Sequence, residues 1–217
     1  MKNIFSTIAI AGAFMAATPS VVYAQFSMPS IPGMGKSLSG AAPADLNGQQ
    51  SKLVAAYVAA DKDVLTANSK MLEALGLKTE ATASKATADA LTEGATKDNL
   101  VAADKEISVS TDAVAAELKK SPKLDAASKA TFGAGLVALA SGVTKFLGLG
   151  KNVSEMSSAL SSAPMTQLPN LQSAVSLVAK FPGTLTSVGA SLKNAIAFAQ
   201  SNDIPVPGDA TKALAAL

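Results

Sequence analysis

Apolar residues return at steps of three and four along most of the chain after residue 45, and this period constrains the fold more than any other feature. In the first such segment the apolar positions are Leu53, Val54, Tyr57, Val58, Val64, Leu65, Leu72 and Leu75. This spacing places apolar side chains on one face of an α-helix. No segment alternates apolar and polar residues as a half-buried strand would. The pattern therefore predicts an all-α fold, an elongated bundle of about six or seven helices.

Turn residues and capping residues divide this region into separate helices. Gly76 is expected to end the first long helix, and Thr96 is expected to cap a later one. Ser121-Pro122 indicates the start of the next helix, because proline suits the first turn of a helix. Asn152 is expected to cap a short helix, and Pro182-Gly183 is expected to break another.

The first 44 residues differ in composition from the rest of the chain. Met1-Lys2, an apolar run over residues 4–17 and the small-residue site Val22-Tyr23-Ala24 predict a secretory signal peptide over residues 1–24. The run is too short to span a bilayer. Residues 25–44 are rich in Pro, Gly and Ser, which predicts a flexible leader. We therefore expect a periplasmic or secreted protein of Gram-negative type, and no lipoprotein, because the chain lacks cysteine.

Residues 45–217 are expected to form a single all-α domain. They contain an approximate internal similarity between residues 45–120 and residues 121–203. Leu75-Gly76-Leu77 is matched by Leu147-Gly148-Leu149 about 70 residues later. An internal duplication would produce two similar helical halves. Chance similarity among so few residue types is the alternative, and the sequence leaves both open.

Absent residue types exclude several classes of chemistry. The chain has no Cys, His or Trp, and all 18 basic residues are lysines. We therefore expect no zinc, copper or haem site, no His-dependent catalytic triad and no arginine fork for phosphates. The scarcity of aromatic residues argues against nucleic-acid binding. Gly35-Lys36-Ser37 resembles the end of a phosphate-binding loop, but Ser30 stands where the motif needs glycine, so we expect no bound nucleotide.

The carboxylates show no pattern that marks a metal or acid–base site. Asp61-Lys62-Asp63 begins like a calcium loop, but Thr66 and Leu72 replace the required glycine and glutamate. We interpret this segment as an exposed helix face. Other acids alternate with lysines at helix-pair spacing, as in Asp104/Lys105 and Glu117/Lys120. The sequence therefore predicts a non-enzymatic protein with no catalytic residues, cofactor or metal.

The segment from Ala130 to Gly150 is the most unusual part of the chain, because Lys145 is its only charge and four glycines interrupt it. Three interpretations remain open. The segment is a central bundle helix whose glycines allow close packing, a wall of a cavity for a lipid or quinone, or a membrane-inserting helix. For the cavity, the candidate lining residues are Phe132, Leu136, Val143, Phe146, Phe181 and Phe198.

These inferences favour one function and leave two alternatives. We expect an exported helical protein that acts through protein–protein contacts or self-association, as a scaffold, adaptor or assembly component of the envelope or extracellular space. The first alternative is a carrier of an apolar small molecule or lipid. The second is a membrane-active helical protein.

Overall fold

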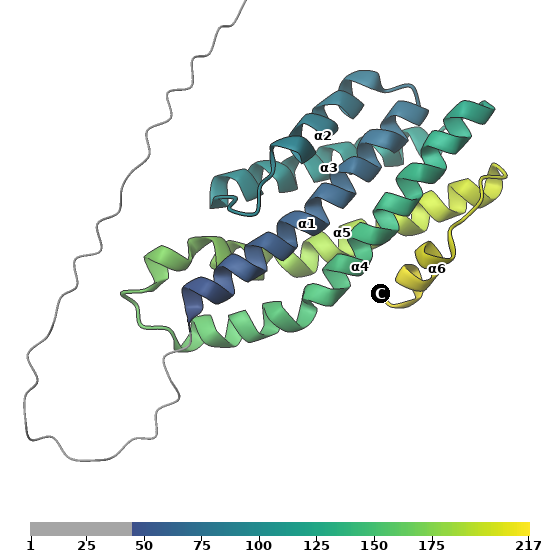
Figure 1. Cartoon of the computed structure of the whole chain (residues 1–217). Helices are drawn as coiled ribbons and strands as arrows, with labels where there is room; N and C mark the ends of the chain where they lie inside the picture. Colours follow the sequence, from purple (N-terminus) through teal and green to yellow (C-terminus); the bar gives the residue numbers. More distant parts are fainter. Residues whose placement is uncertain (1–44) are drawn as a thin grey trace, which may run out of the picture. The chain divides into compact units, whose positions relative to one another are not determined.

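A computed structural model describes residues 45–217 of the chain. The predicted signal peptide (1–24) and leader (25–44) lie outside the described residues. Six α-helices and one 3-10 helix make up the described part, which contains no strand, and the all-α prediction is confirmed (Figure 1). The helices are α1 (Leu46–Ala74), α2 (Lys78–Ala90), α3 (Lys97–Lys119), α4 (Ala126–Ser162), α5 (Gln172–Ser201) and α6 (Gly208–Ala215), with η1 (Leu168–Leu171) before α5.

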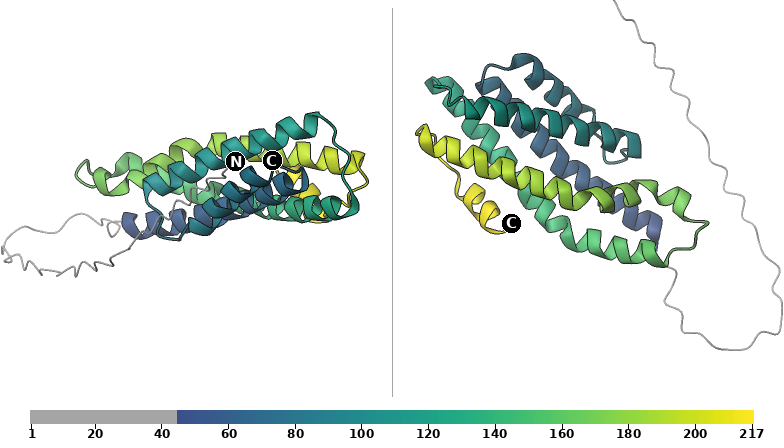
Figure 2. Two further views of the ribbon diagram at one scale, coloured as in Figure 1. Left: turned by 90° about the horizontal axis from the view of Figure 1, so that it is seen from above. Right: turned by 180° about the vertical axis from the view of Figure 1, so that it is seen from behind.

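The four long helices form a bundle in which α1 and α5 each contact both α3 and α4 (Figures 1 and 2). α4 runs antiparallel to α1, since Gly135 near its start faces Met71 while Lys145 further along pairs with Asp63. The two short helices lie on the outside of the bundle. α2 packs on α1 and α3, and α6 packs on α4 and α5.

Two glycines bring α4 unusually close to α1. A Cβ atom added at Gly142 would lie 2.8 Å from Val64 Cγ2, and one at Gly135 would lie 3.0 Å from the Ala67 carbonyl oxygen. The two glycines are seven residues apart, so they lie on the same face of α4. This contact matches the first interpretation of the Ala130–Gly150 segment, in which glycine allows helices to pack closely.

Several predicted helix ends are confirmed. Gly76 has a φ angle of +84° directly after α1, a conformation that glycine adopts without strain. Thr96 caps α3 through a reciprocal pair of contacts with Asn99, since each side chain accepts a hydrogen bond from the other residue's backbone N–H. These local signals satisfy backbone groups that a helix end leaves unpaired.

Removing the cap of α3 is expected to weaken the fold measurably. Thr96→Ala should lower the free energy of unfolding by about 1 kcal/mol, because the Asn99 backbone N–H loses the acceptor of its 3.3 Å hydrogen bond. Urea denaturation followed by circular dichroism measures the change. The neighbouring Thr92→Ala exchange, which removes no helix cap, serves as the control, and equal losses in the two variants would contradict the assignment.

Three predicted boundaries are wrong. α4 begins at Ala126 rather than at Pro122, because Asp125 accepts a 2.7 Å hydrogen bond from the Ser128 N–H while Ser121 sits in a left-handed conformation. Asn152 lies inside α4, and Pro182 lies inside α5. In both helices, apolar side chains on either side of the expected break are buried against the bundle, so tertiary packing outweighs the local signal.

The two predicted halves share an order of long, short and long helices, with α1, α2 and α3 in one half and α4, η1 and α5 in the other. Their glycine markers differ, however. Gly76 ends α1, whereas Gly148 lies within α4. The internal duplication stays a prediction.

Candidate functional site

The six residues predicted to line an apolar cavity lie in the bundle core. Their exposed fractions are 0% for Phe132, Leu136, Val143 and Phe146, 6% for Phe181 and 7% for Phe198. The Phe132 and Phe198 ring centroids are 5.0 Å apart, and those of Phe146 and Phe181 are 6.3 Å apart. These contacts join α4 to α5. Phe198 also borders a surface hollow near the ends of α3 and α5.

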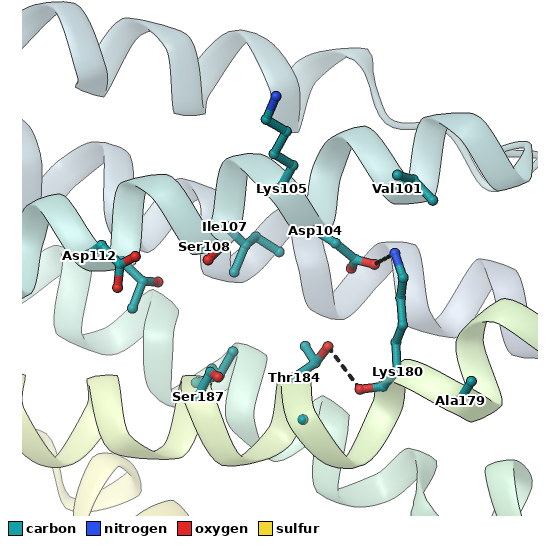
Figure 3. Close-up of a pocket in the computed structure, with 13 residues that line it drawn as sticks. Val101, Asp104, Lys105, Ile107, Ser108, Asp112, Ala179, Lys180, Thr184 and Ser187 are labelled. Atoms are coloured by element: carbon teal, nitrogen blue, oxygen red, sulfur yellow. Dashed lines mark hydrogen bonds and ion pairs between the residues drawn. The ribbon is translucent and has the colours of Figure 1, made fainter.

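The seam between α3 and α5 is the open side of the bundle. Three hollows of about 540, 230 and 500 Å³ follow one another along it. Successive hollows share lining residues, Thr111 between the first two and Leu118 between the last two, so they form one groove. Figure 3 shows the first hollow, with α3 and α5 as its two walls. We call this surface the α3–α5 groove.

Small side chains on α5 account for the open seam. Ala179, Gly183, Ser187, Ala190 and Asn194 recur at steps of three and four, and all five line the groove. Such residues project little from the helix, so they leave space between α5 and the facing wall. On the other sides of the bundle, α2 covers the junction of α1 with α3, α6 lies on α4 and α5, and close packing seals α1 against α4.

A cluster of polar side chains lies at the start of the groove. Asp104 of α3 receives a 3.0 Å hydrogen bond from the Tyr57 hydroxyl and forms a 2.9 Å ion pair with Lys180 of α5. The Thr184 hydroxyl lies 3.3 Å from the Tyr57 hydroxyl. The ion pair crosses from one wall of the groove to the other, as Figure 3 shows. Within residues 45–217 it is the ion pair that joins α3 to α5.

Asp61 lies beside this cluster and is fully buried, with an exposed fraction of 0%. Neither of its carboxylate oxygens has a hydrogen-bond partner. Burial raises its pKa well above the ordinary aspartate value, the nearby negative charge of Asp104 adds to the rise, and Lys180 opposes it. Burial, followed by the charges of Asp61 and Asp104, also raises the pKa of the Tyr57 hydroxyl far above its usual value.

The interpretation of Asp61 and Asp63 as one exposed helix face is therefore wrong for Asp61. Asp63 lies at the surface, where it forms a 2.7 Å ion pair with Lys145. Asp61 instead follows Tyr57 by four residues and precedes Asn68 by seven, so it belongs to the buried stripe of α1. This spacing from Tyr57 and Asn68 is the sequence signal that could have predicted the burial of Asp61. Asp104, which the sequence places among acids that alternate with lysines, forms its ion pair with Lys180 of another helix.

Asp104 is paired with Lys180, and Asp61 is fully buried and is not among the residues that line the first hollow. No group of three metal-ligating side chains occurs within residues 45–217.

Further along the seam, the Asn68 amide of α1 donates 2.8 Å and 3.0 Å hydrogen bonds to Ser110 and Thr111 of α3. This polar layer fixes α3 on α1.

A separate hollow, of about 570 Å³, lies outside the α3–α5 groove, between the start of α4 and the segment that leads to α6. It is lined by Ala126, Lys129, Ala130, Gly133, Val137, Ile204, Pro205, Val206 and Pro207. Apart from Lys129, these side chains are apolar. α4 itself is long and apolar enough to cross a membrane, and half of its most apolar stretch is buried within the bundle.

The candidate site thus consists of Asp104 and Lys180, which line the first hollow, and of the buried Tyr57 and Asp61 behind them. Comparison of the chain with protein-family models, with curated proteins and with solved structures found no match.

Proposed function

We propose that this protein is an exported, non-enzymatic adaptor or scaffold that binds a partner helix along the α3–α5 groove. The observation that carries the proposal is the chain of three connected hollows between two long helices. A groove of this length matches the side of an α-helix better than it matches a compact small molecule.

The way in which the bundle covers its other junctions supports a helical partner. α2 buries Ala81, Ser84 and Ala88 against the bundle, and α6 buries Ala210 and Ala213. Both covering helices thus use small side chains on the buried face. The small side chains of the α3–α5 groove leave room for an incoming helix of the same kind, with alanine or serine at positions that recur every three or four residues.

The charges along the groove add a requirement for the partner. Lys105, Asp112 and the Asp104–Lys180 pair lie along the first hollow, and Lys119 lies at the far end. A partner helix with both acidic and basic residues at the rim of its apolar face fits this mixture. Such rim charges would set the orientation more than the affinity.

Photo-crosslinking in the producing cell tests the proposal. A photoreactive amino acid at Ser187, which is exposed and lines the groove, should form an adduct of discrete mass with one partner or with a second copy. The neighbouring Thr186, also exposed but outside the groove lining, is the matched control position. Adduct yield at Ser187 should clearly exceed the yield at Thr186.

A blocking substitution gives the independent check. Ser187→Trp should fill the groove and abolish the adduct formed from a second photoreactive position at Ser108, whereas Thr186→Trp should leave it intact. Equal adducts from the groove and control positions, or an adduct that survives Ser187→Trp, would refute helix docking in this groove.

The apolar hollow beside α4 favours a second candidate function, the carriage of an apolar small molecule or lipid. Its volume of about 570 Å³ and its nearly apolar lining fall within the range of small-molecule sites. Native mass spectrometry of protein purified without detergent should then show a stoichiometric bound ligand. Its loss in Gly133→Leu, which narrows the hollow, would locate the ligand there. A measured mass equal to that of the protein alone would reject the carrier function and would be compatible with the adaptor function.

A further inference from the structure

The polar cluster at the mouth of the groove holds a feature that partner binding alone does not explain. Asp61 is a buried carboxyl group with two unpartnered oxygen atoms, next to the ion pair that joins the two groove walls. Buried polar atoms in folded proteins almost always have partners. A carboxyl group in this position is tolerated while it is protonated, and it becomes strongly unfavourable once it carries a charge.

The charged groups around Asp61 differ in what they can do when it ionises. Asp104 of α3 repels the new charge, and the Tyr57 hydroxyl already donates a hydrogen bond to Asp104. Lys145 of α4 is held by Asp63, and the charged residues of α2, Lys78, Glu80, Lys85 and Asp89, are exposed. Lys180 of α5 is the cation that acts on Asp61, and its long, flexible side chain can change partners.

We propose that Asp61 is a proton-operated switch of the α3–α5 groove: when its carboxyl group releases its proton to solvent, Lys180 moves from Asp104 to Asp61, and α3 is released from α5. No covalent bond between heavy atoms changes. The ion pair between α3 and α5 is replaced by one between α1 and α5. The groove thus keeps its present width in acid and widens at higher pH.

The switch would govern when the partner helix can enter, and in that sense it rests on the proposed function. The test of the switch does not depend on the proposed function, because opening of the groove is measurable on the protein without a partner. A negative crosslinking experiment would reject partner binding but not the switch. A negative switch experiment would reject the pH dependence of the groove width but not partner binding.

Tyr57 reports the ionisation of Asp61. The chain has two tyrosines and no tryptophan, so Tyr57 is the single ultraviolet reporter in full-length Tyr23→Phe protein. Its near-ultraviolet circular dichroism should change in one step, with a midpoint well above the usual aspartate pKa. Asp61→Asn should remove this step. Asp63→Asn, which removes a carboxylate from the same helix on the side of α4, should retain it.

A buried thiol reports the opening of the groove. The chain has no cysteine, and Val188 is fully buried at the floor of the first hollow. Two proteins should be labelled with a thiol reagent at each pH, the Val188→Cys variant and the Val188→Cys/Asp61→Asn double variant. The ratio of their two labelling rates cancels the effect of pH on the ionisation of the thiol itself. This ratio should rise at least about fivefold across the Tyr57 transition. Ser191→Cys, which lines the second hollow, replaces the probe if Val188→Cys misfolds.

Lys180→Met, which breaks the ion pair at every pH, should give fast labelling throughout the titration. Three results would overturn the switch. They are a Tyr57 signal without a transition, a transition with a constant labelling ratio, or a Lys180→Met variant that is still protected in acid.

Discussion

Asp61→Leu is expected to raise the free energy of unfolding by about 2–4 kcal/mol near neutral pH. The side chain is fully buried, and both carboxylate oxygens lack partners. Leucine has the same branched arrangement of side-chain heavy atoms and needs no hydrogen bond, and exchanges of buried ionisable groups for apolar ones stabilise proteins by about this amount. Urea denaturation of the two proteins under identical conditions measures the difference.

The gain should depend on pH, and its sign follows from the raised pKa of Asp61. Above the pKa of an unfolded aspartate, the folded protein keeps a proton that the unfolded chain has released, so its stability falls by about 1.4 kcal/mol per pH unit. This fall continues until the pH passes the pKa of the folded state. The stability difference between Asp61→Leu and the parent protein should therefore be smallest in acid and grow as the pH rises.

Asp63→Leu is the matched control for this prediction. Asp63 lies two residues further along α1, where it is partly exposed and paired with Lys145. Its replacement should lower stability by at most about 1 kcal/mol, as expected for a surface ion pair. A destabilised Asp61→Leu protein, or an equal effect of both exchanges, would mean that Asp61 has a stabilising partner in the folded state.

Gly142→Ala and Gly135→Ala are each expected to lower the free energy of unfolding by about 1–3 kcal/mol, the usual effect of overpacking. The new methyl group at position 142 would lie 2.8 Å from Val64 Cγ2 and 3.3 Å from the Ala60 carbonyl oxygen. At position 135 it would meet the Ala67 carbonyl oxygen at 3.0 Å. A backbone atom cannot move aside alone, so α1 and α4 would have to separate.

Gly148→Ala in the same helix is the internal control. Nothing lies within 4 Å of a Cβ atom at this position, so alanine should stabilise α4 by about 0.5–1 kcal/mol through its higher helix propensity. Thermal unfolding followed by circular dichroism should thus show opposite shifts for Gly148→Ala and Gly142→Ala. Shifts of the same sign would indicate that α1 and α4 pack less closely than described.

Comparison of the expected and observed elements shows which sequence signals were decisive. The three- and four-residue period predicted the helical class, and Gly76 and Thr96 marked helix ends correctly because their effects involve neighbouring residues only. Asn152 and Pro182 are equally local signals, yet α4 and α5 continue through them. The free energy gained by burying apolar side chains on both sides of these positions exceeds the free energy that a helix cap would contribute or that an internal proline costs.

The candidate site was less predictable than the fold. Tyr57 and Asp104 are 47 residues apart in the chain, and Asp104 and Lys180 are 76 apart. No spacing rule connects such positions. The register of Asp61 with Tyr57 on α1 was a readable clue to burial, whereas the openness of the groove depends on how far α3 stands from α5.

The sequence by itself determined that this chain is helical, which faces of its helices are apolar, and that it contains no Cys, His, Trp or Arg. These properties depend on residue type and on spacing within one helix. Only the tertiary structure decided that Asp61 has no partner, that Lys180 crosses to Asp104, and that the seam between α3 and α5 stays open. Burial, charge pairing and free space are properties of side chains from different helices, and they exist only once those helices have packed together.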